Sequence, residues 1–296
     1  MLTRNKKERF IEKSLLITAL ASLLGLAGIV FFLFREGLPV FHFVSVTDFL
    51  LGKEWYPTEE PPVFGIFPLI LGSLVVTVIS GLIAIPLGVM TAAYLSEIAS
   101  ARVRSIVKPF VELLAALPSV VIGFVGMVIV APFLQDVFGA PSGLNLFNAS
   151  LLLAFMAVPT ICSITEDALQ GVPRALKEAS LALGATRWET MRKITFPGAF
   201  SGTATAVMLG MSRSIGETMV VLMVAGGAAI IPESLFDPVR PMPASIVAEM
   251  AEAPFRGSHY FALFATGIVL FAFTFVFNAV AFKISEKYKL KVQSGI

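Results

Sequence analysis

The sequence has 296 residues, of which 56% are hydrophobic and 26 are Phe, and its mean hydropathy is +0.86. This composition excludes a soluble globular protein and indicates an integral membrane protein. The formal net charge of +2 gives no indication of a nucleic acid or another polyanion as partner. The single cysteine, Cys162, excludes an internal disulfide and a cysteine-clustered metal site.

Six apolar stretches predict an all-α membrane protein with six transmembrane helices. About 20 apolar residues in a helix cross a bilayer, and the predicted helices cover residues 14–34, 66–95, 113–134, 150–165, 198–225 and 260–282. The first is interpreted as an uncleaved helix, because the cleavage-like triplet Ala19-Leu20-Ala21 lies inside the apolar run. Pro86, Pro118 and Pro159 predict kinks or helix ends.

The distribution of basic residues predicts the orientation of these helices. Of the 22 Lys and Arg residues, 17 fall in segments on the side of the N-terminus, four fall in loops on the opposite side, and Arg213 falls within a span. Short loops rich in Lys and Arg remain in the cytoplasm. We therefore expect both termini and the polar segment 172–197 to be cytoplasmic.

The polar segment 172–197 predicts two short helices joined by a sharp corner. Pro173 suits a first helical turn, and Gly184 suits the left-handed position that ends a helix. Thr186 and Glu189 have the spacing of a capping box at the start of a second helix. The second helix carries the apolar residues Trp188 and Met191 among basic ones, so it is suited to lie in a groove of another protein.

Two charges interrupt the fifth apolar stretch. Arg213 and Glu217 are four residues apart, so in one helix they can form an ion pair, which reduces the cost of placing charge in a bilayer. We weigh a purely structural pair against a path for an anion, in which the arginine would meet the anion and Ser212, Ser214 and Thr218 would supply hydroxyls.

A stripe of small residues runs along the same predicted helix. Gly202, Ala206 and Gly210 are spaced four residues apart and would allow another helix to approach closely. This stripe is expected to continue the face of the charged pair, so that the pair faces protein or a path between helices.

The remaining polar residues give no sign of an enzyme. The phosphate-binding pattern G-x-x-x-x-G-K-[ST] is missing. His42 and His259 are expected to be interfacial and without a metal, and Glu166 and Asp167 to be solvated charges at a helix end. A short helix at 245–253, with Ile246, Val247 and Met250 on one side, is expected in the largest outer loop, either as a lid or as a docking surface.

The polar segment resembles the E-A-A loop of ABC importer permeases, E-A-A-x3-G-x9-I-x-L-P. The matching positions are Glu178, Ala179, Ser180, Gly184, Ile194, Phe196 and Pro197. Ser180 replaces the second alanine of the pattern and Phe196 replaces the leucine. The resemblance implies that this loop, with Trp188 at its corner, contacts a cytoplasmic ATPase subunit and couples it to the membrane helices.

Further stretches between residues 55 and 283 resemble the phosphate importer permeases. They are Trp55-Tyr56-Pro57, residues 64–73, 85–88, 94–97 and 112–124, and Arg213-Ser-Ile-Gly-Glu-Thr218, the last of which is closer to the PstC type than to the PstA type. The resemblance implies a type I ABC importer permease in a bacterial inner membrane. Its expected partners are lipid, a second, similar permease, two ATPase subunits that bind the ATP, and an extracytoplasmic phosphate-binding protein; no cofactor is expected on this chain.

The expected organisation has three parts. Residues 1–62 hold the basic N-terminus, the first span and an external loop, residues 63–283 hold the permease domain, and residues 284–296 form a basic tail. Two rival functions remain open. One is a permease of this architecture for another oxyanion such as sulfate, molybdate or phosphonate. The other is an ion-coupled secondary transporter, against which the importer-type loop and the lack of a recognisable inverted repeat both argue.

Overall fold

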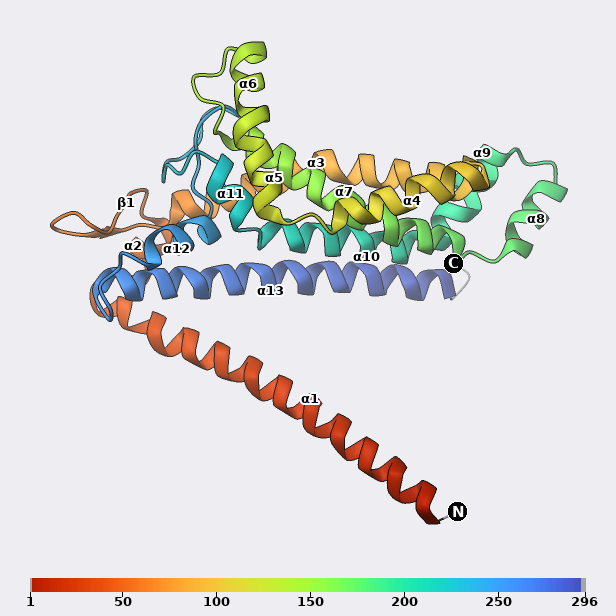
Figure 1. Ribbon diagram of the computed structural model, residues 1–296, viewed down its shortest axis with the longest axis horizontal. Helices are drawn as coiled ribbons and strands as arrows, with labels where there is room; N and C mark the ends of the chain where they lie inside the picture. The colour runs from red at the N-terminus through yellow and green to blue at the C-terminus, as the bar shows by residue number, and fades with distance from the viewer. Residues whose placement is uncertain (1, 294–296) are drawn as a thin grey trace.

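The computed structural model describes the backbone of residues 2–293 and the side chains of residues 8–283 (Figure 1). The basic residues of the two ends outside 8–283, among them Arg4 and Lys291, therefore lie outside the described side chains. The elements in chain order are α1 (Leu2–Gly37), η1 (Leu38–His42), α2 (Val46–Leu51), β1 (Trp55–Tyr56), β2 (Val63–Phe64), α3 (Phe67–Ala93), η2 (Tyr94–Ile98), α4 (Ala101–Ala115), α5 (Ser119–Val125), η3 (Gly126–Val130), α6 (Ala131–Phe138), α7 (Leu146–Gln170), α8 (Arg174–Ala182), α9 (Arg187–Thr190), η4 (Met191–Thr195), α10 (Phe196–Ile215), α11 (Met219–Val224), α12 (Met242–Met250) and α13 (Ser258–Gln293). Of the η elements, η1 is a 3-10 helix, and η2, η3 and η4 are π-helical turns.

Six helical stretches of the described chain are long and apolar enough to cross a membrane, which confirms the predicted number. They are Glu8–His42, Phe67–Ile98, Ser119–Phe138, Leu146–Gln170, Arg187–Ile215 and Ser258–Lys283. The fourth is longer than expected, because α7 has 25 residues and continues through Pro159 without ending there. Likewise α3 does not end at Pro86, whereas Pro118 does begin a new helix.

Two of the predicted boundaries are wrong. The stretch predicted at 113–134 is divided, because α4 ends at Ala115 and the spanning helix begins at Ser119. The stretch predicted at 198–225 is also divided, because α10 ends at Ile215 and the short α11 follows only after a turn. Average hydropathy hides both breaks, since longer apolar runs lie on both sides of each.

Helices α3, α7, α10 and α13 run side by side along the long axis (Figure 1). Small residues allow α7 to approach both of its neighbours closely. A Cβ added at Gly88 of α3 or at Gly210 of α10 would lie 2.7 or 2.6 Å from side-chain atoms of Ile161, and one added at Gly202 would lie 2.4 Å from the Cβ of Ala168. The small-residue stripe of α10 therefore packs against α7, as expected of such a stripe between membrane helices.

Helix α1 diverges from the other spans (Figure 1). The C-terminal end of α1 meets the N-terminal part of α13, where the rings of Phe32 and Phe264 lie 5.6 Å apart and Gly37 lies against Ile268. Most of its described side chains are exposed within this chain. This apolar surface is therefore left for lipid or for another subunit.

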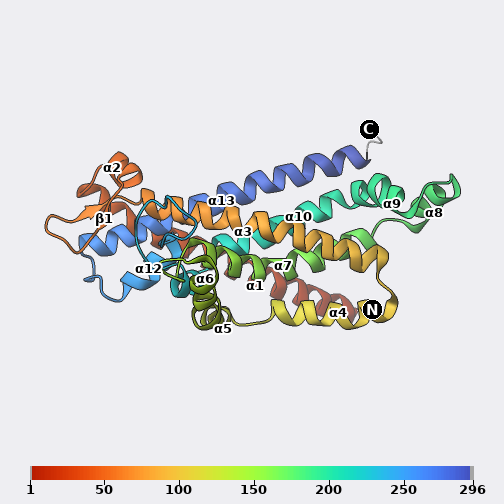
Figure 2. The same cartoon turned by 90° about the horizontal axis from the view of Figure 1, so that it is seen from above.

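The bundle has two unlike ends, seen at opposite sides of Figures 1 and 2. The α8 end carries α8 and α9, and both ends of the described chain lie toward it, as an even number of spans requires. The α12 end carries α2, α12 and a two-stranded antiparallel pair in which Trp55 faces Phe64. The polar segment 172–197 and the loop that holds α12 are thus separated by the length of the bundle (Figures 1 and 2).

Helix α12 begins three residues earlier than the predicted outer helix. Its buried residues are Met242, Pro243, Ala244 and Ser245, whereas Val247, which was expected on the apolar side, is exposed. The backbone N–H of Met242 donates to Ser73 Oγ on α3 at 2.8 Å. The first turn of α12 is therefore fastened to the end of the bundle.

Candidate functional site

The segment from Pro173 to Pro197 forms the corner that its sequence predicts. Pro173 precedes α8, and Gly184 adopts a φ of +86°, which glycine reaches without the steric cost that other residues meet. Thr186 and Glu189 form the capping box of α9: the Thr186 N–H donates to Glu189 Oε2 at 2.9 Å, and the Glu189 N–H donates to Thr186 Oγ1 at 3.2 Å. Local hydrogen bonds thus fix the direction in which the chain re-enters the bundle.

The apolar side chains of this corner are largely uncovered. Leu183 is 90% exposed and Trp188 is 64% exposed, and α8 buries none of its residues. Met191 is different, because it is buried against the bundle. Of the positions of the E-A-A pattern, the exposed ones are Glu178, Ala179, Gly184 and Pro197, and the half-buried ones are Ser180, Ile194 and Phe196. A second protein could therefore cover α8 and Trp188 without displacing any part of this chain.

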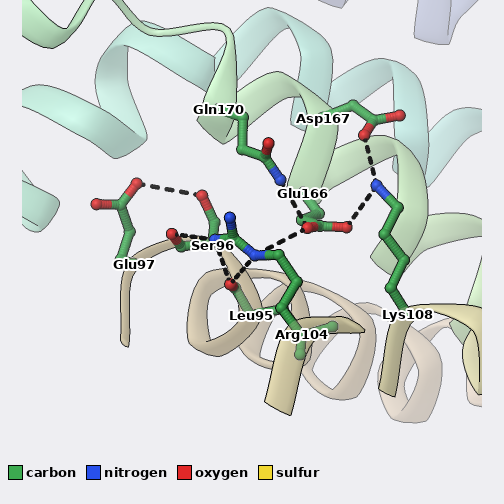
Figure 3. A network of polar contacts seen from close by, with 8 residues as sticks. All are labelled: Leu95, Ser96, Glu97, Arg104, Lys108, Glu166, Asp167 and Gln170. Atoms are coloured by element: carbon green, nitrogen blue, oxygen red, sulfur yellow. Dashed lines mark hydrogen bonds and ion pairs between the residues drawn. The ribbon is translucent and has the colours of Figure 1, made fainter. Parts of the chain in front are cut away.

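Glu166 is not a solvated end charge, and that expectation is wrong. Its side chain is only 1% exposed, and its carboxylate lies 2.9 Å from Lys108 Nζ and 3.5 Å from Arg104 Nε (Figure 3). Asp167 is 67% exposed, as expected, and lies 3.0 Å from the same Lys108 Nζ. The hydrogen bond to Glu166 raises the pKa of Lys108, against the opposing effect of its partial burial, so the ammonium stays charged.

This network ties three helical segments together at the α8 end. Gln170 donates to Glu166 Oε1 at 2.6 Å, and the guanidinium of Arg104 also donates to the carbonyl oxygens of Leu95 and Ser96 in η2 (Figure 3). A π-helical turn leaves carbonyl groups out of the regular helical pattern, and such groups need another donor. Arg104 supplies it and fastens α4 to both η2 and α7.

Arg213 and Glu217 do not form the expected ion pair. Gly216 ends α10 between them, and Arg213 is exposed and makes no ion pair in the part of the chain that the structure describes. Glu217 instead accepts hydrogen bonds from the N–H groups of Met219 and Val220, at 3.1 and 3.4 Å. It therefore caps α11 and leaves the guanidinium of Arg213 free.

The hydroxyl groups around Arg213 also point in different directions. Ser214 is buried and continues the stripe of Gly210 against α7, so the stripe and Arg213 lie on different faces of α10. Ser212 donates to Asn278 of α13 at 2.5 Å. Thr218 donates to the Gly216 carbonyl within the turn that follows α10. Of the five residues predicted to line the anion path, Arg213 is thus the one whose charged group has no partner in the described part of the chain.

A second polar network, centred on the carboxylate of Glu249, lies at the α12 end and was not predicted. The carboxylate of Glu249 accepts hydrogen bonds from Trp55 Nε1 at 3.0 Å, Arg240 Nη1 at 2.5 Å and Ser245 Oγ at 3.0 Å, and it lies 2.8 Å from His259 Nε2. His259 is therefore a buried partner of Glu249, whereas His42 is exposed. Within residues 8–283, no three His, Cys, Asp or Glu residues are grouped so as to hold a metal ion.

Comparisons with known proteins agree with this architecture. Residues 84–289 match the family described as binding-protein-dependent transport system inner membrane component. The chain is 36% identical to the probable ABC transporter permease protein YqgH of Bacillus subtilis, covering 97% of this chain and 94% of that one. It is also 36% identical to the phosphate transport system permease protein PstC of Mesorhizobium japonicum, over 79% of this chain and 76% of the relative.

Solved transporters share the fold at lower identity. A chain of a bacterial alginate ABC transporter, in complex with a periplasmic protein, superposes with a TM-score of 0.68 at 17% identity and covers 95% of this chain and 96% of its own. A chain of the inward-facing MetNI methionine ABC transporter gives a TM-score of 0.58 at 22% identity and covers 73% and 93%. With six apolar helices, the arrangement of the bundle and the match over residues 84–289, the chain belongs to the family of inner membrane components of binding-protein-dependent transport systems.

Proposed function

We propose that this chain is the PstC-type permease subunit of an ATP-driven importer for inorganic phosphate. The observation that carries the proposal is the likeness to PstC proteins, which extends over 77–81% of the chain in relatives from several bacteria. In this role the chain would form a path through the inner membrane together with a second, similar permease. ATP would bind to two separate ATPase subunits, and a phosphate-binding protein would deliver the anion from outside.

The α8–α9 corner is the proposed contact with the ATPase. Its contact residues would be those of the E-A-A pattern together with Trp188, namely Glu178, Ala179, Ser180, Gly184, Trp188, Ile194 and Pro197. The exposed α8 and Trp188 support this role, because a helix with uncovered apolar side chains can be received by a groove. The same proposal makes the α8 end cytoplasmic and the α12 end external.

Orientation can be tested separately from transport. A reporter fused after Lys193 should read cytoplasmic, and one fused after Pro241 should read external. A cytoplasmic reading at Pro241 would contradict the proposed orientation, because this residue lies at the end of the bundle opposite to α8.

Arg213 is the proposed contact for the passing anion. A guanidinium presents a planar fork of donors that matches two oxygens of phosphate, and the exposed Arg213 has no competing carboxylate in the described chain. Glu217, Thr218, Ser212 and Ser214 would act by shaping the turn after α10, since each is engaged with protein atoms. Arg213→Lys keeps the charge but loses the fork, so partial transport is expected.

The decisive experiment is uptake by proteoliposomes that contain the two permeases, the ATPase and the binding protein. We expect labelled phosphate to enter only with internal ATP, and Arg213→Gln to abolish entry while the protein remains inserted. Preference for sulfate or molybdate over phosphate would reassign the substrate. Uptake driven by an ion gradient without the ATPase would identify a secondary transporter instead.

A further inference from the structure

Helix α8 is joined to the bundle by little apolar contact. None of its residues is buried, and beside it lies a hollow of about 400 Å³. The hollow is lined by residues of α8, α9, the start of η4 and the end of η2, among them Ile98, Leu181, Trp188 and Met191. Close packing transmits a displacement only where atoms touch, so this junction has to transmit motion by other contacts.

Lys177 provides the polar contact across this junction. Its Nζ lies 2.7 Å from Glu97 Oε1 and donates to the Leu169 carbonyl oxygen at 3.2 Å. Both side chains of the Lys177–Glu97 pair are only 19% exposed. In the described part of the chain, the only other α8 side chain that forms a hydrogen bond outside its helix is that of Ser180, which pairs with Thr190 of α9 at 2.9 Å.

The two partners of Lys177 belong to two different membrane helices. Glu97 lies in η2, which continues α3, and Leu169 lies in the last turn of α7. The end of a helix has carbonyl groups without helical partners and a partial negative charge, so an ammonium group is favourable there. One lysine therefore holds α8 against the ends of both α3 and α7.

Beyond Glu97 the polar contacts continue into the bundle. Ser96 Oγ donates to Glu97 Oε1 at 3.2 Å, and the Ser96 carbonyl accepts from Arg104, which lies 3.5 Å from Glu166 (Figure 3). Contacts therefore run without a gap from α8 through η2 and α4 to α7.

We propose that Lys177 is a positioning residue that transmits the displacement of α8 to α3 and α7 through its contacts with Glu97 and with the end of α7. The inference rests on the proposed contact between α8 and an ATPase subunit. Without Lys177, the chain connections at both ends of α8 would absorb its movement before that movement reached the bundle. ATP would then be hydrolysed with little transport.

The test compares variants in the complete importer in proteoliposomes, using the second permease, the ATPase and a binding protein loaded with phosphate. Three quantities are measured: ATPase retained on the permease, ATP hydrolysed and phosphate taken up. For Lys177→Met and for Glu97→Gln we expect normal retention, and uptake per ATP about fivefold to tenfold lower, in the lower range of coupling between sites. A loss of folded protein would lower hydrolysis and uptake together and leave this ratio unchanged.

The exchanged pair, Lys177→Glu with Glu97→Lys, should raise the ratio above that of either single variant, because the ion pair is remade. Arg174→Met removes one exposed positive charge from the same helix and should keep the wild-type ratio. An unchanged ratio in Lys177→Met, loss of ATPase from that variant, or an exchanged pair no better than the single variants would each overturn the inference. A wild-type permease that retains no ATPase would instead overturn the proposed function.

Discussion

Burial decides how much each of two adjacent carboxylates contributes to stability. Glu166 and Asp167 lie 2.9 and 3.0 Å from the same Lys108 Nζ, but Glu166 is 1% exposed and Asp167 is 67% exposed. Glu166→Gln keeps the shape and removes the charge, so we expect a loss of about 1.5–3 kcal/mol, as for hydrogen bonds to charged groups. Asp167→Asn removes a solvent-screened pair and should cost about 0–1 kcal/mol.

The opposite change should cost more. Arg104→Met combined with Lys108→Met leaves the Glu166 carboxylate buried without either base, and removal of the partners of a buried charge costs about 3–5 kcal/mol. Because both bases are about one-third exposed, the lower part of that range is expected. The measurement is the free energy of unfolding of the purified protein in mixed detergent micelles. Equal costs for Glu166→Gln and Asp167→Asn, or a double variant milder than Glu166→Gln, would refute the reasoning.

Two further predictions use the same unfolding measurement, and a third uses fluorescence. Glu217→Ala should cost about 1 kcal/mol, as for the loss of a helix cap, whereas a structural ion pair with Arg213 would instead make Arg213→Gln equally costly. Gly184→Ala should cost about 1 kcal/mol, because a residue other than glycine is strained at a positive φ. A steric clash does not contribute, since no atom lies within 4 Å of the new Cβ, and the absence of any cost would mean that the corner relaxes. Glu249→Ala should shift the fluorescence of Trp55 to longer wavelength in a Trp188→Phe background, since the indole N–H loses its acceptor and water can take its place; an unchanged spectrum would show that Trp55 stays buried without it.

The sequence predicts those parts of the structure that depend on local or averaged properties. Hydropathy is an average over about 20 residues, so the number of spans is correct although two of them are divided. The capping box of Thr186 and Glu189 is correct because its hydrogen bonds join residues three apart. The break after Ile215 depends on Glu217 turning to the N–H groups that follow it, and an ion pair with Arg213 was the equally local alternative.

Contacts between distant segments were missed for a different reason. The adjacent Asp167 suggests a solvated helix end for Glu166 as well. However, Glu166 follows the buried Cys162 by four residues and precedes the buried Leu169 by three, which places it on the packed face of α7. Arg104 and Lys108, four residues apart on α4, provide the matching charges. One sequence does not show which helices pack against each other. It therefore does not show that Glu97 pairs with Lys177 of α8.

The π-helical turn η4 makes the corner sensitive to the length of the chain between α9 and α10. A π-helical turn contains one residue more than an α-helical turn, and each residue advances an α-helix by about 100°. Deletion of one residue from Met191–Thr195 would allow a regular helix and would rotate α9 by about that angle about the axis of α10. Trp188 would then face a different side, even though every remaining side chain is unchanged. The direction of the corner is thus set by a count of residues, which a substitution scan of this turn would not detect.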